Sequence, residues 1–372
     1  MDRAWIELDL NNLENNINEI KKIIPEKTKI MAVVKANAYG HGDIQIARKL
    51  SDIGIEDFAV ATIQEGIKLR KSGIKGSILI LGYTDISSVD NLLAYDLTQT
   101  SLDLEYAKQL NKYNVCGKKV KVHIKLNTGM NRIGESYKNI DNIVKTYKLE
   151  NIKVEGIFSH LCVADSLEKS DVEFTNAQID NFTSCVNEVK KHVKDIGKVH
   201  LQNSYGLLNY PAFIGDYVRP GIIMYGVYST KDKDIQRKIN IKPVLSLKAK
   251  ITSTRTILKG ESAGYGRKYI ASKDTKIASV CIGYADGYPR ALSCKDTKVL
   301  VNGEYATVIG NICMDQLILD ISDCKNVKRG DVVTLIGRDK DKEITAMYLA
   351  EKADSMTYEI LSRLGDRLNV KI

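Results

Sequence analysis

The chain has 372 residues, 44% of them hydrophobic, and a formal net charge of +9 at pH 7. This length favours two or more domains with a sizeable buried core. The lysines are spread along the whole chain and no segment forms a basic arm, which argues against a nucleic-acid-binding protein. A diffuse positive surface favours anionic ligands and phosphorylated cofactors instead.

No window approaches eighteen uninterrupted apolar residues, so the sequence predicts no membrane span. Residues 1–7 lack the basic and apolar stretches of an export signal. The seven cysteines form no Cys-x-x-Cys pair, which argues against a disulfide framework and against a zinc site. We therefore expect reduced thiols, no bound metal and a cytoplasmic location.

Short apolar, β-branched runs recur between residues 29 and 221, separated by segments with apolar residues at three- and four-residue spacing. The predicted strands are 29–35, 57–62, 77–83, 97–101, 121–127, 153–159, 198–203 and 217–220. The predicted helices include 13–20, 44–50, 62–70 and 140–147. Strands and helices that alternate in this way predict a (β/α)₈ barrel, in which catalytic groups lie where strands end and loops begin.

After residue 235 the pattern changes to strands joined by short turns that contain Gly or Asp, with little helix between them. The predicted strands are 244–251, 277–282, 298–301, 317–319 and 331–335. We therefore expect a barrel domain over residues 10–235 and a β-rich domain over 236–372. An earlier strand at residues 4–8 precedes the barrel, and we expect residues 1–9 to join the second domain.

Polar residues gather at the predicted strand ends, and all of them would face the barrel mouth. Lys35 ends the first strand, Arg132 follows the fifth, His160 ends the sixth and Arg219 lies at the end of the eighth. A lysine that closes an apolar run is partly desolvated, which favours the neutral amine and suits Schiff-base chemistry. Taken alone, Lys35 fits an exposed strand terminus better, because most lysines are solvated.

Loops after the seventh and eighth barrel strands commonly hold phosphate groups, and Ser204 and Gly221 occupy these loops. The pair Asn203 and Ser204 fits a helix cap equally well. In the second domain, Tyr265 stands between two glycines on a predicted turn, where it either approaches another surface or packs locally.

Five segments along the chain read as motifs: VVKANAYGHG at 33–42, KLNTGMNRIG at 125–134, VRPG at 218–221, IGYADGYPR at 282–290 and ICMDQ at 312–316. The first of them, around Lys35, is long and specific. Together these segments are similar to motifs of the alanine racemase family, and the resemblance runs along nearly the whole chain.

The resemblance implies a racemase in which Lys35 forms an internal aldimine with pyridoxal 5'-phosphate (PLP). Arg219 would donate to the pyridine nitrogen, and Arg132 would contact the phenolic oxygen of the cofactor or the substrate carboxylate. His160 and Asn203 would lie beside the ring. The residues implied to hold the phosphate are Tyr39, Ser204, Gly221, Ile222 and Tyr358.

The resemblance also implies a head-to-tail homodimer with shared sites, in which Tyr265 and Met314 reach the site from the partner subunit. Racemisation removes a proton from one face of the α-carbon and returns one to the opposite face, so two bases flanking the cofactor are expected. Lys35 and Tyr265 would fill these roles. The implied reaction interconverts L-alanine and D-alanine and supplies D-alanine for peptidoglycan.

The sequence departs from the family at one position that bears on Lys125. In members where the matching lysine is carbamylated and braces the arginine, aspartate often stands where this chain has Asn127. The resemblance therefore leaves carbamylation of Lys125 open.

Segments 158–166 and 203–210 are similar to the racemase portion of the membrane-bound serine/alanine racemases of vancomycin resistance, so serine is the alternative substrate. Tyr358 stands where we expect a smaller polar residue in those enzymes. A PLP-dependent decarboxylase of the same fold would need an acidic partner for the ring nitrogen in place of Arg219. A non-catalytic PLP-binding protein resembles a bare barrel and would lack the domain that carries Tyr265.

Overall fold

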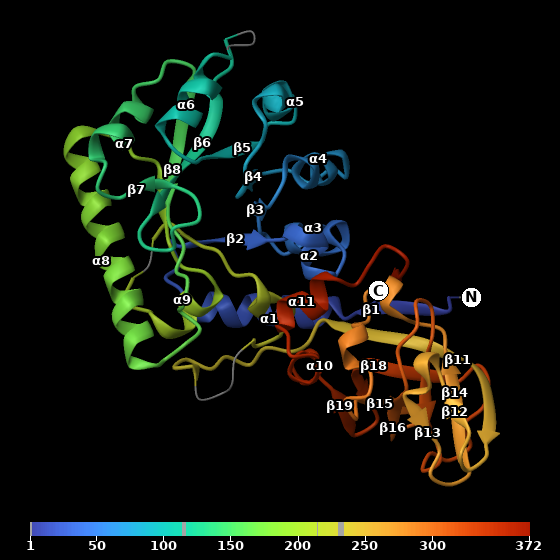
Figure 1. Cartoon of the computed structure of the whole chain (residues 1–372). Helices are drawn as coiled ribbons and strands as arrows, with labels where there is room; N and C mark the ends of the chain where they lie inside the picture. Colours follow the sequence, from blue (N-terminus) through green and yellow to red (C-terminus); the bar gives the residue numbers. More distant parts are fainter. Residues whose placement is uncertain (1, 114–116, 214, 230–233) are drawn as a thin grey trace.

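The computed structural model describes residues 2–113, 117–213, 215–229 and 234–372. Figure 1 shows strands wrapped by helices in one part of the molecule and a smaller β-rich domain beside them.

Within these described ranges, eight parallel strands form a closed barrel, which confirms the predicted fold class. They are β2 (Lys29–Val33), β3 (Asp57–Val60), β4 (Ser77–Ile80), β5 (Thr98–Ser101), β6 (Val120–Asn127), β8 (Ile152–Phe158), β9 (Lys198–His200) and β10 (Tyr217–Val218). Each strand pairs with the next along the chain, and β10 pairs with β2 to close the ring. A two-residue strand, β7 (Glu135–Ser136), pairs with the end of β6.

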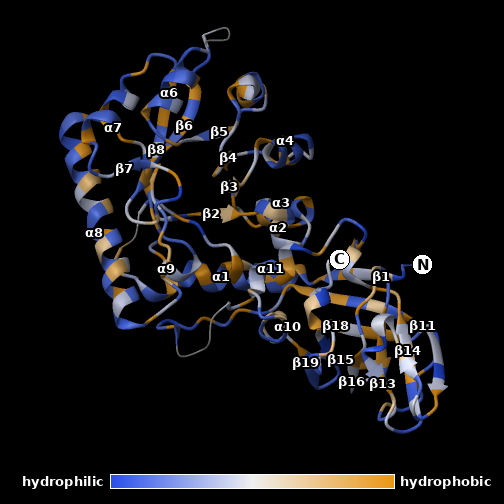
Figure 2. Ribbon diagram, in the orientation of Figure 1, coloured by the Kyte–Doolittle hydropathy of each residue, from blue (hydrophilic) through white to orange (hydrophobic). Residues whose placement is uncertain are grey.

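Helices surround the barrel because each buries one apolar face against the strands. They are α1 (Leu10–Lys22), α3 (Asp43–Asp52), α4 (Ile63–Lys71), α5 (Val89–Ala94), α6 (Leu104–Asn111), α7 (Ile140–Tyr147), α8 (Lys169–His192) and α9 (Ser204–Asn209). Figure 2 shows α8 as mostly hydrophilic with interspersed hydrophobic residues, in keeping with one buried face. Among the described helices, none has both the length and the apolarity needed to cross a membrane.

The second domain is built on a mostly antiparallel sheet with the strand order β19-β18-β15-β16-β17-β14-β11-β1-β20. These strands are β1 (Ala4–Leu8), β11 (Leu245–Ile257), β14 (Thr275–Val280), β15 (Lys298–Val301), β16 (Glu304–Ile309), β17 (Leu317–Asp320), β18 (Val332–Asp339), β19 (Lys342–Ile344) and β20 (Asn369–Lys371). The strand β1 lies inside the sheet, antiparallel to β11 and parallel to β20.

Short elements complete the second domain. The strands β12 (Ser262–Ala263) and β13 (Tyr269–Ile270) form a small hairpin, and the helices α10 (Ala346–Ala353) and α11 (Thr357–Ser362) follow β19. A Cβ at Gly40 of the barrel would run into the Leu361 carbonyl of α11, so the two domains touch closely at this point.

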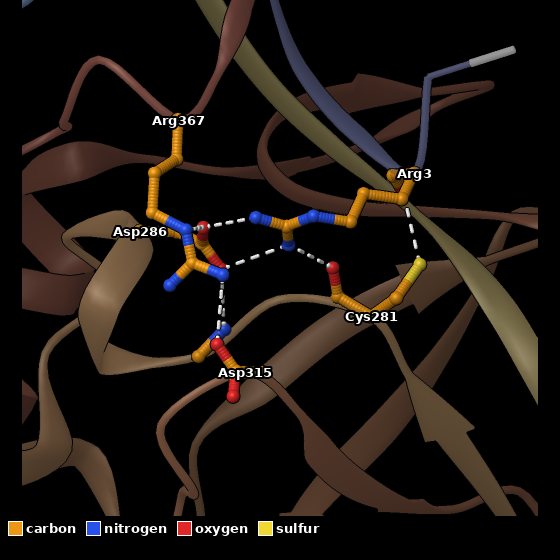
Figure 3. A network of polar contacts seen from close by, with 6 residues as sticks. Arg3, Cys281, Asp286, Asp315 and Arg367 are labelled. Carbon is orange, nitrogen blue, oxygen red and sulfur yellow. Dashed lines mark hydrogen bonds and ion pairs between the residues drawn. The ribbon is translucent and has the colours of Figure 1, made fainter.

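A buried carboxylate ties β1 to the rest of the second domain (Figure 3). Asp286 is fully buried and accepts from Arg3 Nη1 at 3.0 Å and from the Gly283 amide at 3.0 Å. Arg367 Nε lies 3.4 Å from the same carboxylate, and Arg367 Nη2 lies 2.7 Å from Asp315. Three distant segments of the chain therefore meet at one charge, which fixes the loop that contains Gly283.

Candidate active site

The chain leaves β2 through a left-handed turn. The residues with φ between 52° and 54° are Ala36, Asn37, Ala38 and Tyr39. A left-handed backbone costs a non-glycine residue roughly 1–2 kcal/mol, so the surrounding structure must hold this turn in place. Glu65 Oε1 accepts from the amide of Ala36 at 2.7 Å, and the amide of Gly42 donates to the carbonyl of Asn37 at 2.9 Å.

Lys35 is half-buried at the start of this turn, two residues beyond the end of β2, rather than within the strand as predicted. Burial lowers the pKa of its amine, and the charge of Arg132 lowers the pKa further, while Glu65 opposes both effects. The neutral amine is the form that attacks a carbonyl carbon.

Four basic side chains contribute to the electrostatic environment of His160 at the barrel mouth. Burial holds the pKa of His160 well below its usual value, and the charges that add to this effect belong to Arg219, Lys125, Arg132 and Lys35. In the described parts of the chain, none of these four basic groups forms an ion pair with a carboxylate. An excess of basic groups over carboxylates at one set of strand ends favours an anionic ligand.

Arg219 is the most deeply buried of these cations. Its Nη2 donates to the carbonyls of Ser159 at 2.6 Å and Leu201 at 2.9 Å, and its Nη1 lies 2.7 Å from His200 Nδ1. The guanidinium carbon lies 5.2 Å from the centre of the Phe158 ring. Burial lowers the pKa of Arg219 to about 9, which leaves the group charged at neutral pH.

A second histidine extends this network into the barrel. Because a guanidinium only donates, His200 Nδ1 accepts, and neutral His200 carries its proton on Nε2. His200 Nε2 lies 2.8 Å from His123 Nδ1 and donates this proton to it. Burial lowers the pKa of His200 well below its usual value and that of His123 to about 3, so both rings are neutral.

Lys125 is buried beside Arg219 and Arg132. Burial and then these two charges hold the pKa of its amine well below its usual value. Its Nζ donates weakly to the Leu126 carbonyl at 3.3 Å. Asn127 does not brace either cation, because its Oδ1 accepts from the amide of Asn131 at 3.0 Å and its Nδ2 donates to Asn131 Oδ1 at 2.9 Å.

The predicted phosphate residues gather beside the turn that carries Tyr39. The Ser204 hydroxyl accepts from the Gly221 amide at 2.9 Å. A Cβ at Gly221 would lie 2.7 Å from the Tyr39 hydroxyl, so this close approach requires glycine. The buried Ile222 follows, and the ring of Tyr358 lies 6.2 Å from that of Tyr39.

Burial raises the pKa of Tyr39 to about 12 and raises the pKa of Tyr358 as well, so both phenols keep the proton that they can donate. Asn203 is a helix cap: its Oδ1 accepts from the Gly206 amide at 2.8 Å, and its Nδ2 donates to the Leu161 carbonyl at 3.1 Å.

Two predicted site residues lie apart from this cluster, on the surface of the second domain. Tyr265 is 74% exposed on the turn between β12 and β13, where Gly264 and Gly266 have φ of 75° and 70°. Met314 is 53% exposed, and its carbonyl accepts from the Ala285 amide at 3.0 Å. Among the described residues, neither side chain forms a hydrogen bond, an ion pair or a ring contact with the barrel mouth of its own chain.

The sequence reading missed the pair His123 and His200. The two residues lie on β6 and β9, and on β8 between these strands a Cβ at Gly156 would come within 2.8 Å of the His123 ring. A glycine in a strand that separates two histidine-bearing strands is a sequence signal that would have found the pair.

Comparison with known proteins gives a single family over both domains. A family model described as "Alanine racemase, N-terminal domain" matches residues 8–229, and one described as "Alanine racemase, C-terminal domain" matches residues 244–372. The solved structure named alanine racemase from Clostridium difficile 630 superposes with a TM-score of 0.92 at 35% identity, covering 100% of this chain and 96% of that one.

Curated relatives carry the same family name or a broader one. Alanine racemase 1 of Clostridium acetobutylicum is 40% identical over 98% of this chain and 94% of its own length. An amino-acid racemase of Enterococcus faecalis is 46% identical over 99% of this chain, but the chain spans only 51% of that relative.

The buried histidines predict acid sensitivity. Burial lowers the pKa of four histidines. The pKa falls to about 4 for His41 and to about 3 for His123, and it lies well below its usual value for His160 and His200. The unfolded chain therefore binds more protons below pH 6.5, and the free energy of unfolding falls as the pH drops toward these folded-state values. Each proton contributes about 1.4 kcal/mol per pH unit, which gives an upper limit of about 5 kcal/mol per unit near pH 5.

Urea unfolding followed by circular dichroism at pH 6.5, 5.5 and 5.0 measures how steeply the free energy of unfolding falls with pH. His123→Asn removes one titrating ring, so it should reduce this slope by up to about 1.4 kcal/mol per pH unit. Asp57, whose pKa burial raises, opposes the trend. Stability that stays constant over this range would contradict the neutral state of the four rings.

Proposed function

The chain belongs to the alanine racemase family, and from this premise we propose that it interconverts L-alanine and D-alanine with PLP bound at the barrel mouth. The observation that carries the proposal is the group of four basic side chains near His160, which includes Lys35 and has no carboxylate partner in the described ranges.

The residues at the barrel mouth suit PLP, which carries a phosphate and a phenolic oxygen. Arg132 lies at the exposed side of the cluster, where it fits the phenolic oxygen or a substrate carboxylate. Tyr39, Ser204, Gly221 and Ile222 would hold the phosphate with Tyr358, because both phenols remain protonated donors. His160 and Asn203 would flank the ring.

Lys35 would hold the cofactor covalently and exchange a proton with the substrate α-carbon. Its lowered pKa favours the neutral amine, which is the form that acts as a nucleophile and as a base. When bound, PLP withdraws electrons from the α-carbon and so acidifies the α-proton.

Arg219 would donate to the pyridine nitrogen. A guanidinium does not release its proton, so it keeps that nitrogen unprotonated, which should disfavour transamination. The carbonyls of Ser159 and Leu201 fix the position of this donor. A PLP-dependent decarboxylase would need an acidic side chain in place of Arg219, so the arginine argues against that activity.

Tyr265 of the partner subunit would serve as the second base, and Met314 would come from the same subunit. Their exposure on the second domain supports a homodimer with shared sites.

Tyr358 favours alanine over serine because its ring occupies space beside Tyr39. A pocket of this kind rejects an added hydroxyl only by roughly a hundredfold, so serine remains the alternative substrate. The product would enter peptidoglycan synthesis in the cytoplasm, where the described cysteines, all of them free, would stay reduced.

Lys125 would react with CO₂, because burial and the charges of Arg219 and Arg132 lower the pKa of its amine and favour the neutral form. The nitrogen forms a bond to the carbon of CO₂ as one C–O π bond opens, and the proton that the nitrogen loses passes to solvent. The resulting carbamate anion would neutralise part of the charge of Arg132 and Arg219. Carbon-13 NMR of protein equilibrated with labelled CO₂ should give a carbamate resonance that Lys125→Arg lacks. A spectrum without this resonance would leave Lys125 as an unmodified buried amine.

A chiral assay of the purified protein tests the activity. With PLP added, L-alanine should convert to an equal mixture of both enantiomers, faster than L-serine does. Lys35→Ala should lower kcat by about 10³-fold or more and abolish the PLP that borohydride fixes to the peptide containing residue 35. The matched control is Lys29→Ala, at the other end of β2. Cofactor binding without interconversion would indicate a carrier protein.

Subunit mixing tests the shared site. Lys35→Ala and Tyr265→Ala are each inactive if both residues act at one site. Co-refolding the two variants at equal ratio makes about half the dimers mixed, each with one intact site, so activity should return to about one quarter of wild type. With subunit exchange confirmed by differently tagged chains, a mixture as inactive as its parents would show that both residues act within one chain.

A further inference from the structure

Glu65 joins the two turns that follow the neighbouring barrel strands β2 and β3. Its Oε1 accepts from the amide of Ala36, after β2, at 2.7 Å. Its Oε2 accepts from the amides of Ala61 at 2.6 Å and Thr62 at 3.2 Å, both after β3. One half-buried carboxylate therefore receives three backbone N–H groups from two separate segments, and hydrogen bonds to a charged acceptor are stronger than those to a neutral one.

This carboxylate takes over where the backbone ladder between the two strands stops. The amide of Val34 donates to the carbonyl of Ala59 at 2.9 Å, as in a regular parallel pair. The next two bonds of such a ladder would run from the Ala61 amide to the Val34 carbonyl and from the Ala36 amide to the Ala61 carbonyl. Here the chain turns left-handed at Ala36, and Glu65 accepts from both of these amides instead.

The bond to Ala36 goes beyond the needs of the helix and acts on Lys35. The capping box of α4 consists of the reciprocal bonds between Thr62 and Glu65, whereas Ala36 lies 29 residues before Glu65. The peptide unit between Lys35 and Ala36 is planar, so a bond to its N–H group fixes the orientation of the whole link. Left-handed φ values at Ala36 and the three residues after it are unfavourable, so this turn requires an anchor.

The charge of the carboxylate also acts on the amine of Lys35. Burial and the charge of Arg132 lower the pKa of this amine, and the charge of Glu65 raises it. In the described ranges Glu65 forms no ion pair of its own, since Lys68, three residues further along α4, pairs with Asp43 at 2.7 Å. Glu65 is therefore the acidic group that opposes the loss of the Lys35 proton.

We propose that Glu65 is a positioning residue for Lys35, because its carboxylate clamps the turn after β2 to the turn after β3 and adds one negative charge to the surroundings of the amine. The inference rests on the proposed function only in taking Lys35 as the reacting amine. Glu65 acts through Lys35 and takes no proton from the substrate. Its two effects, the clamp and the charge, are measured separately below.

Hydrogen exchange of the full-length protein tests the clamp. Glu65→Gln keeps a residue that a capping box accepts, but its single side-chain oxygen cannot accept from both turns. The peptide of residues 37–42, whose amides bond within the turn, should exchange about ten- to hundredfold faster, the worth of one hydrogen bond to a charged group. Thr62→Ala is the matched control, because it removes only the hydroxyl that accepts from the Glu65 amide, and it should leave this peptide unchanged. Equal exchange in the two variants would reduce Glu65 to a helix cap and overturn the proposal.

The charge is tested by titrating Lys35 itself. In full-length protein freed of PLP and labelled with carbon-13 lysine, the Cε resonance that Lys35→Ala lacks reports the protonation of this amine. The other charged or titratable groups that act on Lys35 or respond to it are Arg132 and His160, and neither is altered.

The midpoint of this titration should move to lower pH in Glu65→Gln, because the negative charge that favours the protonated amine is lost, and it should stay in place in Thr62→Ala. A midpoint that Glu65→Gln leaves unchanged or raises would refute the effect of the charge. Neither measurement depends on racemisation, so a wild type that fails the chiral assay would refute the proposed function and leave the clamp standing.

Discussion

The buried charge of Arg219 constrains the whole barrel mouth. A guanidinium in a low-dielectric interior must have its N–H groups satisfied, since unsatisfied charged donors are costly. The carbonyls of Ser159 and Leu201 and the ring of His200 meet this need, and they come from the ends of two neighbouring strands, β8 and β9. Arg219 therefore fixes the tautomer of His200, and through it that of His123. Burial, and after it the same charge, holds the pKa values of His160 and Lys125 well below their usual values.

Backbone strain concentrates at the other side of the site. Four successive left-handed residues follow Lys35, and they persist because the surroundings hold them: Glu65 caps the first amide and α11 leaves no room for a side chain at Gly40. This arrangement turns the chain sharply at the end of β2, so that Tyr39 reaches Gly221 within a few residues of Lys35. Strained positions of this kind recur at functional sites, where rigid surroundings prepare the geometry.

The barrel and its strand-end residues were predictable because alternating strands and helices leave few topologies, and a closed parallel barrel brings all strand ends together. Other features were not. The left-handed turn contains no glycine among its four strained residues, so turn propensity gives no sign of it. The strand β16 escaped notice because Glu304 and Tyr305 break the apolar alternation at its start. The choice between cap and ligand for Asn203 depended on the position of the Gly206 amide, which only the fold supplies. The relation between Tyr265 and Lys35 involves a second copy, whose position a single chain does not reveal.

The interior position of β1 has a consequence for how the chain acquires its structure. Residues 4–8 occupy the sheet between β11 and β20, so Trp5 lies opposite Lys248 on one side and Asn369 on the other. Within this chain, β1 is therefore synthesised before its partners β11 and β20, which follow the entire barrel. Contacts of such large sequence separation are slow to form because loop closure precedes them. Until they form, β11 keeps an open hydrogen-bonding edge, which is a site for aggregation or for exchange of β1 between chains. The second domain is thus not a continuous segment of the chain, and its sheet closes only after the whole barrel has been synthesised.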